Sequence, residues 1–147
     1  MVYGGYIMGE QEKITLNLSS VDLAKIDFLV EQGFYSSRSD FIRTAIRNQF
    51  RAHEAVVSDE SLKEVVARKK EADKKTIGGV GVLKLSKEQL EKYSLMNFRV
   101  KIFVIGSLIV DDDVPVELAK KVIKEAKVYG KITALPEIKY YIKRLTT

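Results

Sequence analysis

The sequence has no cysteine and no tryptophan, and its 147 residues include a single histidine, His53. Without cysteine, the chain can form no disulfide framework, thiolate nucleophile or thiolate metal site. One histidine is too few for a zinc or nickel cage of imidazole ligands. We interpret His53 as a surface residue near a helix end, with a functional role as the alternative. The sequence therefore predicts no metal and no cofactor.

Long apolar runs and active-site motifs are also missing. No stretch approaches the roughly 18 consecutive apolar residues of a membrane-spanning helix. The start, MVYGGYIMGEQEK, lacks the basic and apolar regions of a secretory signal. We recognise no Ser/His/Asp set, no glycine-rich phosphate loop and no paired catalytic carboxylates. The sequence thus predicts a cytoplasmic protein that has no membrane segment, is not an enzyme and has no catalytic residues.

Positive charge is in excess but unevenly distributed. The chain has 25 Lys and Arg against 20 Asp and Glu, a net charge of +5. Residues 1–57 hold six basic and seven acidic side chains, residues 58–77 hold six and five, and residues 78–147 hold thirteen and eight. The excess therefore lies in the last part of the chain, and a functional assignment for the first part must rest on pattern.

A strict alternation of polar and apolar side chains follows a glycine-containing start. Residues 1–11 contain three glycines and show no periodicity, so we expect a flexible arm. Residues 13–18, KITLNL, alternate with the period of a half-buried strand. Its apolar face consists of Ile14, Leu16 and Leu18. Its polar face consists of Lys13, Thr15 and Asn17.

Two capped helices are predicted after this strand. Ser19, with Asp22 three residues later, has the spacing of a capping box, and Gly33 is placed to end the helix. Ser37 and Asp40 repeat the capping pattern at the start of a second helix. The apolar stripes consist of Val21, Ile26, Leu29 and Val30 in the first helix and Phe41, Ile42, Ala45, Ile46 and Phe50 in the second. A further stripe of Arg43, Arg47 and Arg51 is interpreted as a solvated face, with phosphate contact as the alternative.

One strand and two helices, about 40 residues, cannot bury their apolar surface alone. Pairing with the same strand of a second copy would give an antiparallel two-stranded ribbon packed beneath four helices. We therefore expect an intertwined homodimer, with a tetramer of two dimers as a further form. The expected dimer core consists of Ile14, Leu16, Leu18, Ile26, Leu29, Phe41, Ile42, Ala45 and Ile46.

The outer face of such a ribbon has the residue types of a base-reading surface. A two-stranded ribbon fits the major groove of double-stranded DNA. There Lys13 can donate to guanine, Asn17 can pair with adenine, and Thr15 offers a hydroxyl and a methyl group. The N–H groups at the start of the second helix, near Ser37 and Arg38, favour a phosphate.

The stretch KITLNLSSVDLAKIDFLVEQGFYSSRSDFIRTAIRNQF resembles the ribbon-helix-helix family of the Arc, MetJ and CopG type over about residues 12–52. The alternating strand, Asp27, the glycine turn and the SRSDFIRTAI run carry the resemblance. It implies a dimeric transcriptional regulator, often an autorepressor, with bases read from Lys13, Thr15 and Asn17. It also implies that Ser37 and Arg38 face a phosphate. Nickel-sensing members need several histidines and a cysteine, which this sequence lacks.

The last part of the chain contains a repeating pattern. Residues 58–77 are predicted to be a helical linker. After them, Gly81, Gly106 and Gly130 begin similar segments, spaced 25 and 24 residues apart. Each segment is followed by an acidic helix start, at Glu88, Glu117 and Glu137. We expect three strand-plus-helix units in a small α/β domain; a short solenoid and chance similarity between β-rich segments are the two interpretations of the pattern.

Two charged segments remain. Residues 111–113, DDD, are interpreted as a loop before Pro115, because the alternating acids and the glycine of a calcium loop are missing. Basic residues between Lys120 and Lys131 alternate with apolar ones. They are interpreted as the solvent-exposed face of a helix and a strand, with non-specific attraction for phosphate as the alternative.

The predicted fold is α+β: an arm (1–11), a ribbon-helix-helix module (12–57), a helical linker (58–77) and an oligomerisation or effector domain (78–147). The predicted function is a sequence-specific DNA-binding transcriptional regulator, expected to be a repressor. Its expected partners are double-stranded DNA, a second copy and an unidentified effector or protein. The alternative is the antitoxin of a toxin–antitoxin pair whose C-terminal part binds a protein. A polymer-forming scaffold of stacked repeats is a third interpretation.

Overall fold

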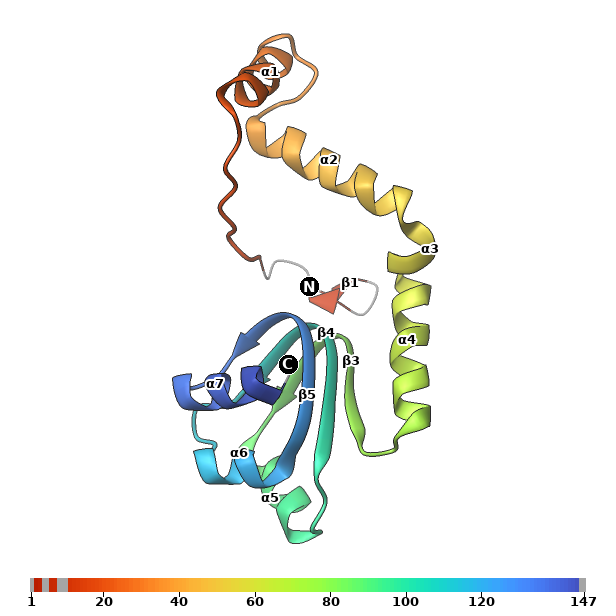
Figure 1. Ribbon diagram of the computed structural model, residues 1–147, viewed down its shortest axis with the longest axis vertical. Helices are drawn as coiled ribbons and strands as arrows, with labels where there is room; N and C mark the ends of the chain where they lie inside the picture. Colours follow the sequence, from red (N-terminus) through yellow and green to blue (C-terminus); the bar gives the residue numbers. More distant parts are fainter. Residues whose placement is uncertain (1, 4–5, 8–10, 146–147) are drawn as a thin grey trace. The chain divides into compact units, whose positions relative to one another are not determined.

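The computed structural model describes residues 2–3, 6–7 and 11–145, and it is mixed α/β. The chain divides into two units, one of residues 10–58 and one of residues 59–147 together with residues 1–9. Each unit is described separately below, with the element labels of Figure 1.

The first unit is helical: α1 (Ser20–Glu31), α2 (Arg38–Ala52) and the short α3 (Glu54–Val57). The Oγ atom of Ser19 accepts a hydrogen bond from the N–H of Asp22 at 3.1 Å, which caps α1 as predicted. Gly33, with φ of +82°, ends the helix, and the N–H of Phe34 donates to the carbonyl of Leu29 at 3.0 Å. Both ends of α1 therefore agree with the capping residues predicted from the sequence.

The predicted strand precedes α1 as an unpaired extended segment. Within the described residues, no strand is assigned at 11–19, and no other segment pairs with it. The two short strands near the start, β1 (Val2–Tyr3) and β2 (Tyr6–Ile7), pair antiparallel with each other, inside the stretch interpreted as an arm. Residues 13–18 thus have their backbone available for a second copy, and the ribbon stays a prediction.

The second unit begins with α4 (Asp59–Ala72), which packs against the sheet through the buried Val66. Three strands and three helices then alternate along the chain. They are β3 (Thr76–Leu85), α5 (Lys87–Leu95), β4 (Val100–Val110), α6 (Val116–Val122), β5 (Ile123–Thr133) and α7 (Pro136–Leu145). The strands form a parallel sheet in the order β3-β4-β5 (Figure 1). The three expected strand-plus-helix units are confirmed, whereas the solenoid stays a prediction.

The three glycines of the repeat lie side by side in the sheet. Gly81 pairs with Gly106, and Gly106 pairs with Gly130, so the spacing in sequence becomes a column across three strands. Each has positive φ, at +112°, +142° and +120° respectively. A Cβ atom on Gly106 would lie 2.0 Å from the carbonyl oxygen of Gly81, and one on Gly130 would lie 2.0 Å from that of Gly106. Only glycine allows the strands to approach and bend here.

Helices α5, α6 and α7 share one core with the sheet. Leu90, Ala119 and Ile138, one from each helix, are fully buried. They pack in a cluster with strand residues such as Leu85 and Val104. The second unit therefore has a continuous hydrophobic core of its own. In the part of the chain that the structure describes, no helix is long and apolar enough to span a membrane.

Candidate nucleic-acid interface

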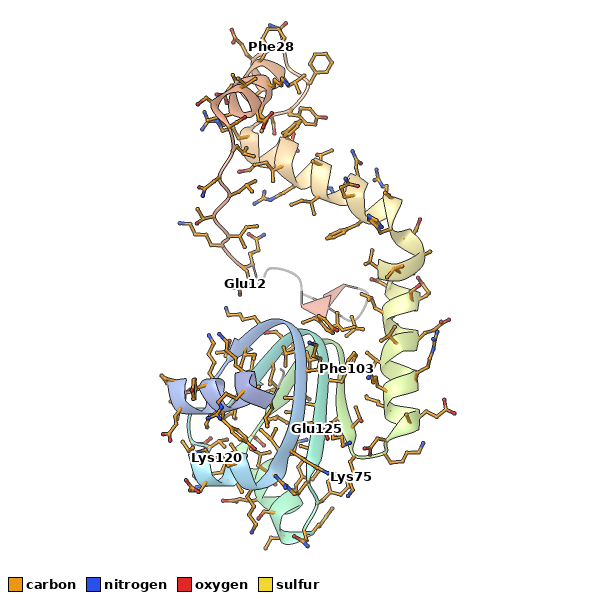
Figure 2. All side chains as sticks on the ribbon, in the orientation of Figure 1. Glu12, Phe28, Lys75, Phe103, Lys120 and Glu125 are labelled. Atoms are coloured by element: carbon orange, nitrogen blue, oxygen red, sulfur yellow. The ribbon has the colours of Figure 1, made fainter. Side chains whose placement is uncertain are left out.

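The segment that is predicted to read bases is exposed in the single chain. Lys13, Thr15 and Asn17 are exposed. On the opposite face, the exposed fractions of Ile14, Leu16 and Leu18 are 78%, 58% and 42%. Figure 2 shows this extended segment running from Glu12 toward α1 with side chains on both sides. Three large apolar side chains on one face of an unpaired segment are expected to be covered by another molecule.

The apolar side chains of the helices in the first unit are also largely uncovered. Of the predicted dimer core, only Ile26 is buried, at 6% exposed. Leu29, Phe41 and Ile42 are half-buried, while Ala45 and Ile46 are exposed. One chain therefore leaves most of this apolar surface open, and the unit lacks the closed core that the second unit has.

The start of α2 is ordered by a hydrogen-bonded turn. The Oγ of Ser37 accepts from the N–H of Asp40 at 3.0 Å, and this confirms the predicted cap. The carboxylate of Asp40 turns back to accept from the N–H of Ser36 at 3.0 Å and from its hydroxyl at 3.2 Å. Tyr35 packs edge-on against Phe41, with ring centroids 5.0 Å apart. These contacts fix the direction of the N-terminus of α2. The first N–H groups of a helix have no acceptor within the helix itself.

Arg38 has a partner that sequence reasoning did not predict. Its Nε and Nη2 atoms donate to the two carboxylate oxygens of Asp27 at 2.7 and 2.8 Å, so the pair joins α2 to α1. The hydrogen bond from Arg38 holds the pKa of the Asp27 carboxyl below its ordinary value. A guanidinium has five N–H donors. Those that do not face Asp27 remain able to meet a phosphate.

Two arginines of the stripe on α2 contact their own helix. Arg47 donates to the hydroxyl of Thr44 at 3.5 Å, and Arg51 donates to the amide oxygen of Asn48 at 3.1 Å. Neither bond is an ion pair. These side chains lie on the exposed surface, as expected for a solvated face.

No metal centre is formed by the described residues: no group of three or more His, Cys, Asp or Glu side chains is placed to hold an ion. Asp111, in the acidic loop between β4 and α6, pairs with Lys84 at 3.4 Å.

A charged hollow lies at the start of the three parallel strands. Its volume is about 660 Å³, and Phe103 and Ile102 contribute apolar walls. At its rim, Nζ of Lys101 contacts the carboxylates of Asp73 at 2.9 Å and Glu125 at 3.3 Å. The hydrogen bond from Lys101 lowers the pKa of Asp73, and the same bond raises the pKa of Lys101. Figure 2 labels Phe103 and Glu125 in this region. Its opposite charges largely neutralise each other, which makes it a weak site for any single ion.

A family model described as the Ribbon-Helix-Helix transcriptional regulator family matches residues 9–139. No curated protein and no solved structure matches the chain. The resemblance recognised from residues 12–52 therefore extends much further, through both units and into α7. Sequence reasoning missed this extent because the strand-and-helix repeat contains no motif with its own chemistry.

Proposed function

Because the chain belongs to the ribbon-helix-helix transcriptional regulator family, we propose that it is a homodimeric repressor that binds specific DNA sequences through a β-ribbon. One observation carries the proposal. In residues 13–18 an uncovered apolar face lies back to back with a polar face of base-reading residue types, and no other segment of the described chain pairs with it.

Two copies of this segment would pair antiparallel about a twofold axis. Ile14, Leu16 and Leu18 of both copies would then turn toward α1 and α2 and be covered. Burial of each such side chain is worth roughly 1.5–3 kcal/mol. Several of them per copy give an association free energy large enough to form a stable dimer.

The opposite face of the ribbon would enter the major groove. Lys13 would donate to guanine, Asn17 would form paired hydrogen bonds with adenine, and Thr15 would contact thymine. The N-terminus of α2, with Ser37 and Arg38, would hold a phosphate of the DNA backbone. Two such dimers on neighbouring half-sites would form a tetramer on the operator.

The compact second unit favours a regulator over the antitoxin alternative. That alternative expects a tail that becomes ordered only on its protein partner. Residues 76–145 instead form a parallel sheet with a closed core, including Leu85, Val104 and Ile142. We propose that this unit serves an effector, a partner or further assembly.

The ribbon is tested by selecting bound sequences from random duplex DNA and then replacing Thr15 and Asn17 with alanine. A well-paired side chain is worth about 1–3 kcal/mol of discrimination against a wrong base. We expect the double variant to bind the selected and random duplexes almost equally, while the dimer persists. The matched control, Thr133→Ala with Asn48→Ala, changes the same residue types at other exposed positions and should keep the preference. Unchanged discrimination in the ribbon variant would contradict the proposal.

A further inference from the structure

Most of the net positive charge of the chain arises in its last strand and helix. Residues 123–145 contain six Lys and Arg against two acidic residues, so this stretch has a net charge of +4 out of +5 for the whole chain. Residues 10–58, which hold the proposed ribbon, contain six basic and seven acidic side chains. The unit proposed to read DNA therefore has little long-range attraction for it, whereas the other unit has a strongly basic part.

The basic side chains lie on two neighbouring elements at one edge of the sheet. β5 is an edge strand, and α7 packs beside it with Ile138 and Ile142 in the core. The hydroxyl of Tyr141 donates to the carbonyl of Ile123 at 2.7 Å and so fixes α7 to the start of β5. We call the basic residues of these two elements the basic edge. They are Lys124, Lys127, Lys131, Lys139, Lys143 and Arg144.

Two lysines of the basic edge, Lys124 and Lys127, are available to a charged partner. Other lysines of this unit, such as Lys84, Lys92 and Lys101, contact a carboxylate. Lys124 and Lys127 form no ion pair with any residue that the structure describes, and both are exposed. An unpaired, exposed ammonium group keeps its full charge for a negatively charged partner.

Exposed tyrosines accompany these cations. Tyr129 is 54% exposed, with Nζ of Lys127 at 5.2 Å from its ring centroid. Tyr140 is 65% exposed, with the guanidinium carbon of Arg144 at 5.8 Å. Tyrosine hydroxyls and cationic side chains are both common donors to DNA phosphates. This combination of exposed cations and exposed tyrosines favours contact with a nucleic-acid backbone over a surface that meets only solvent.

We propose that the basic edge is a second contact surface for duplex DNA, one that binds phosphates without reading sequence. The proposal rests on the proposed function, because it assumes that DNA is the partner of this chain. Phosphate contacts release bound counterions and supply most of the sequence-independent affinity of DNA-binding proteins. The basic edge would thus provide the attraction that the nearly neutral first unit lacks.

The test measures the salt dependence of DNA binding by the full chain. In one variant Lys124, Lys127 and Lys139 are all replaced by glutamine. Affinities for the selected duplex and for a random duplex of equal length are measured between about 50 and 200 mM salt. We expect both affinities to fall by the same factor. The slope of log K against log salt should become shallower by about 0.9 for each phosphate that the variant no longer binds.

The matched control removes the same charge from ion-paired residues of the same unit: Lys84→Gln, Lys87→Gln and Lys92→Gln. This variant should keep the parent slope. Circular dichroism checks that both variants remain folded. Equal slopes for the parent, the test variant and the control would overturn the proposal. So would tighter binding of poly-L-glutamate than of either duplex, because that result would assign the basic edge to an acidic protein.

The two proposals can fail separately. If the parent shows no sequence preference but the test variant still loses affinity and slope, the ribbon proposal fails and the basic edge stands. If the parent prefers the selected duplex and the test variant keeps the parent slope, the basic edge fails and the ribbon stands.

Discussion

Arg38 has two tasks in the proposed complex, because it joins two helices and also faces the DNA. Its bidentate pair with Asp27 fixes the planar guanidinium before any phosphate arrives. A fixed side chain loses less conformational entropy on binding than a free one. The neighbouring carboxylate also cancels its charge at long range. We therefore expect Arg38 to contribute a directed hydrogen bond and little electrostatic steering.

The same pair gives a prediction about pH. Hydrogen bonding by Arg38 holds the pKa of Asp27 below its ordinary value in the folded chain. A depressed pKa stabilises the fold at pH values above the unfolded pKa of about 3.9, and this contribution is lost as the pH falls through the folded value. The stability difference between the parent and Asp27→Asn should therefore be largest near neutral pH and shrink in acid. Unfolding by urea at several pH values measures it, with Glu31→Gln as the control at an exposed position of the same helix. A difference that does not vary with pH would contradict this role.

Short-range features of the sequence predicted residue roles better than long-range ones. Ser19 and Ser37 were predicted as caps because a cap depends only on residues three positions away. The contact between Asp27 and Arg38 spans eleven positions and depends on the angle between two helices. No local sequence pattern determines the angle between the two helices.

At the scale of elements, the glycine column determines how the three strands meet. The spacing of Gly81, Gly106 and Gly130 predicted three similar units, and the structure places these residues in register. The extra residues of the middle unit, around Asp112, lie in the loop between β4 and α6, so they do not disturb the pairing. The parallel order was not predictable from spacing alone. It follows from the helices that return the chain after each strand.

Replacement of Gly106 by alanine should destabilise the second unit by roughly 2–6 kcal/mol, from backbone strain together with overpacking. The added methyl group would meet the carbonyl oxygen of Gly81 at 2.0 Å, and the residue has a φ of +142°. Chemical unfolding followed by circular dichroism measures the loss. Gly79→Ala is the matched control in a neighbouring strand, because its Cβ would meet nothing within 4 Å. An equal loss in both variants would mean that close approach at Gly106 does not limit the sheet.

Over the whole molecule, the two units differ in how their apolar surface is covered. The second unit encloses side chains such as Leu108 and Ile142 completely, whereas the first leaves Ile14 and Phe50 open. Sequence reasoning anticipated this contrast for the first unit, because one strand and two helices are too few to form a core. It could not show the arrangement of the second unit, whose residues have no diagnostic chemistry.

Dilution should therefore affect the two units unequally. Hydrogen exchange in α1 and α2 should quicken as the chain is diluted, because dimer and fold are lost together, while exchange in β4 stays slow. Leu16→Ala should weaken the dimer roughly 1,000-fold, since each copy loses a buried leucine worth at least about 2 kcal/mol. Leu95→Ala makes the same change at a side chain that is 87% exposed and should leave the dimer intact. Concentration-independent exchange in α1 would contradict the shared core.

The open apolar face of residues 13–18 also has a consequence for how a cell would use this regulator. Where assembly is incomplete, the abundance of the DNA-competent form rises with the square of the number of chains made. A twofold change in synthesis then alters operator occupancy about fourfold in the dilute limit. The uncovered segment would thereby make the response of the proposed regulator steeper than linear, without any small-molecule effector.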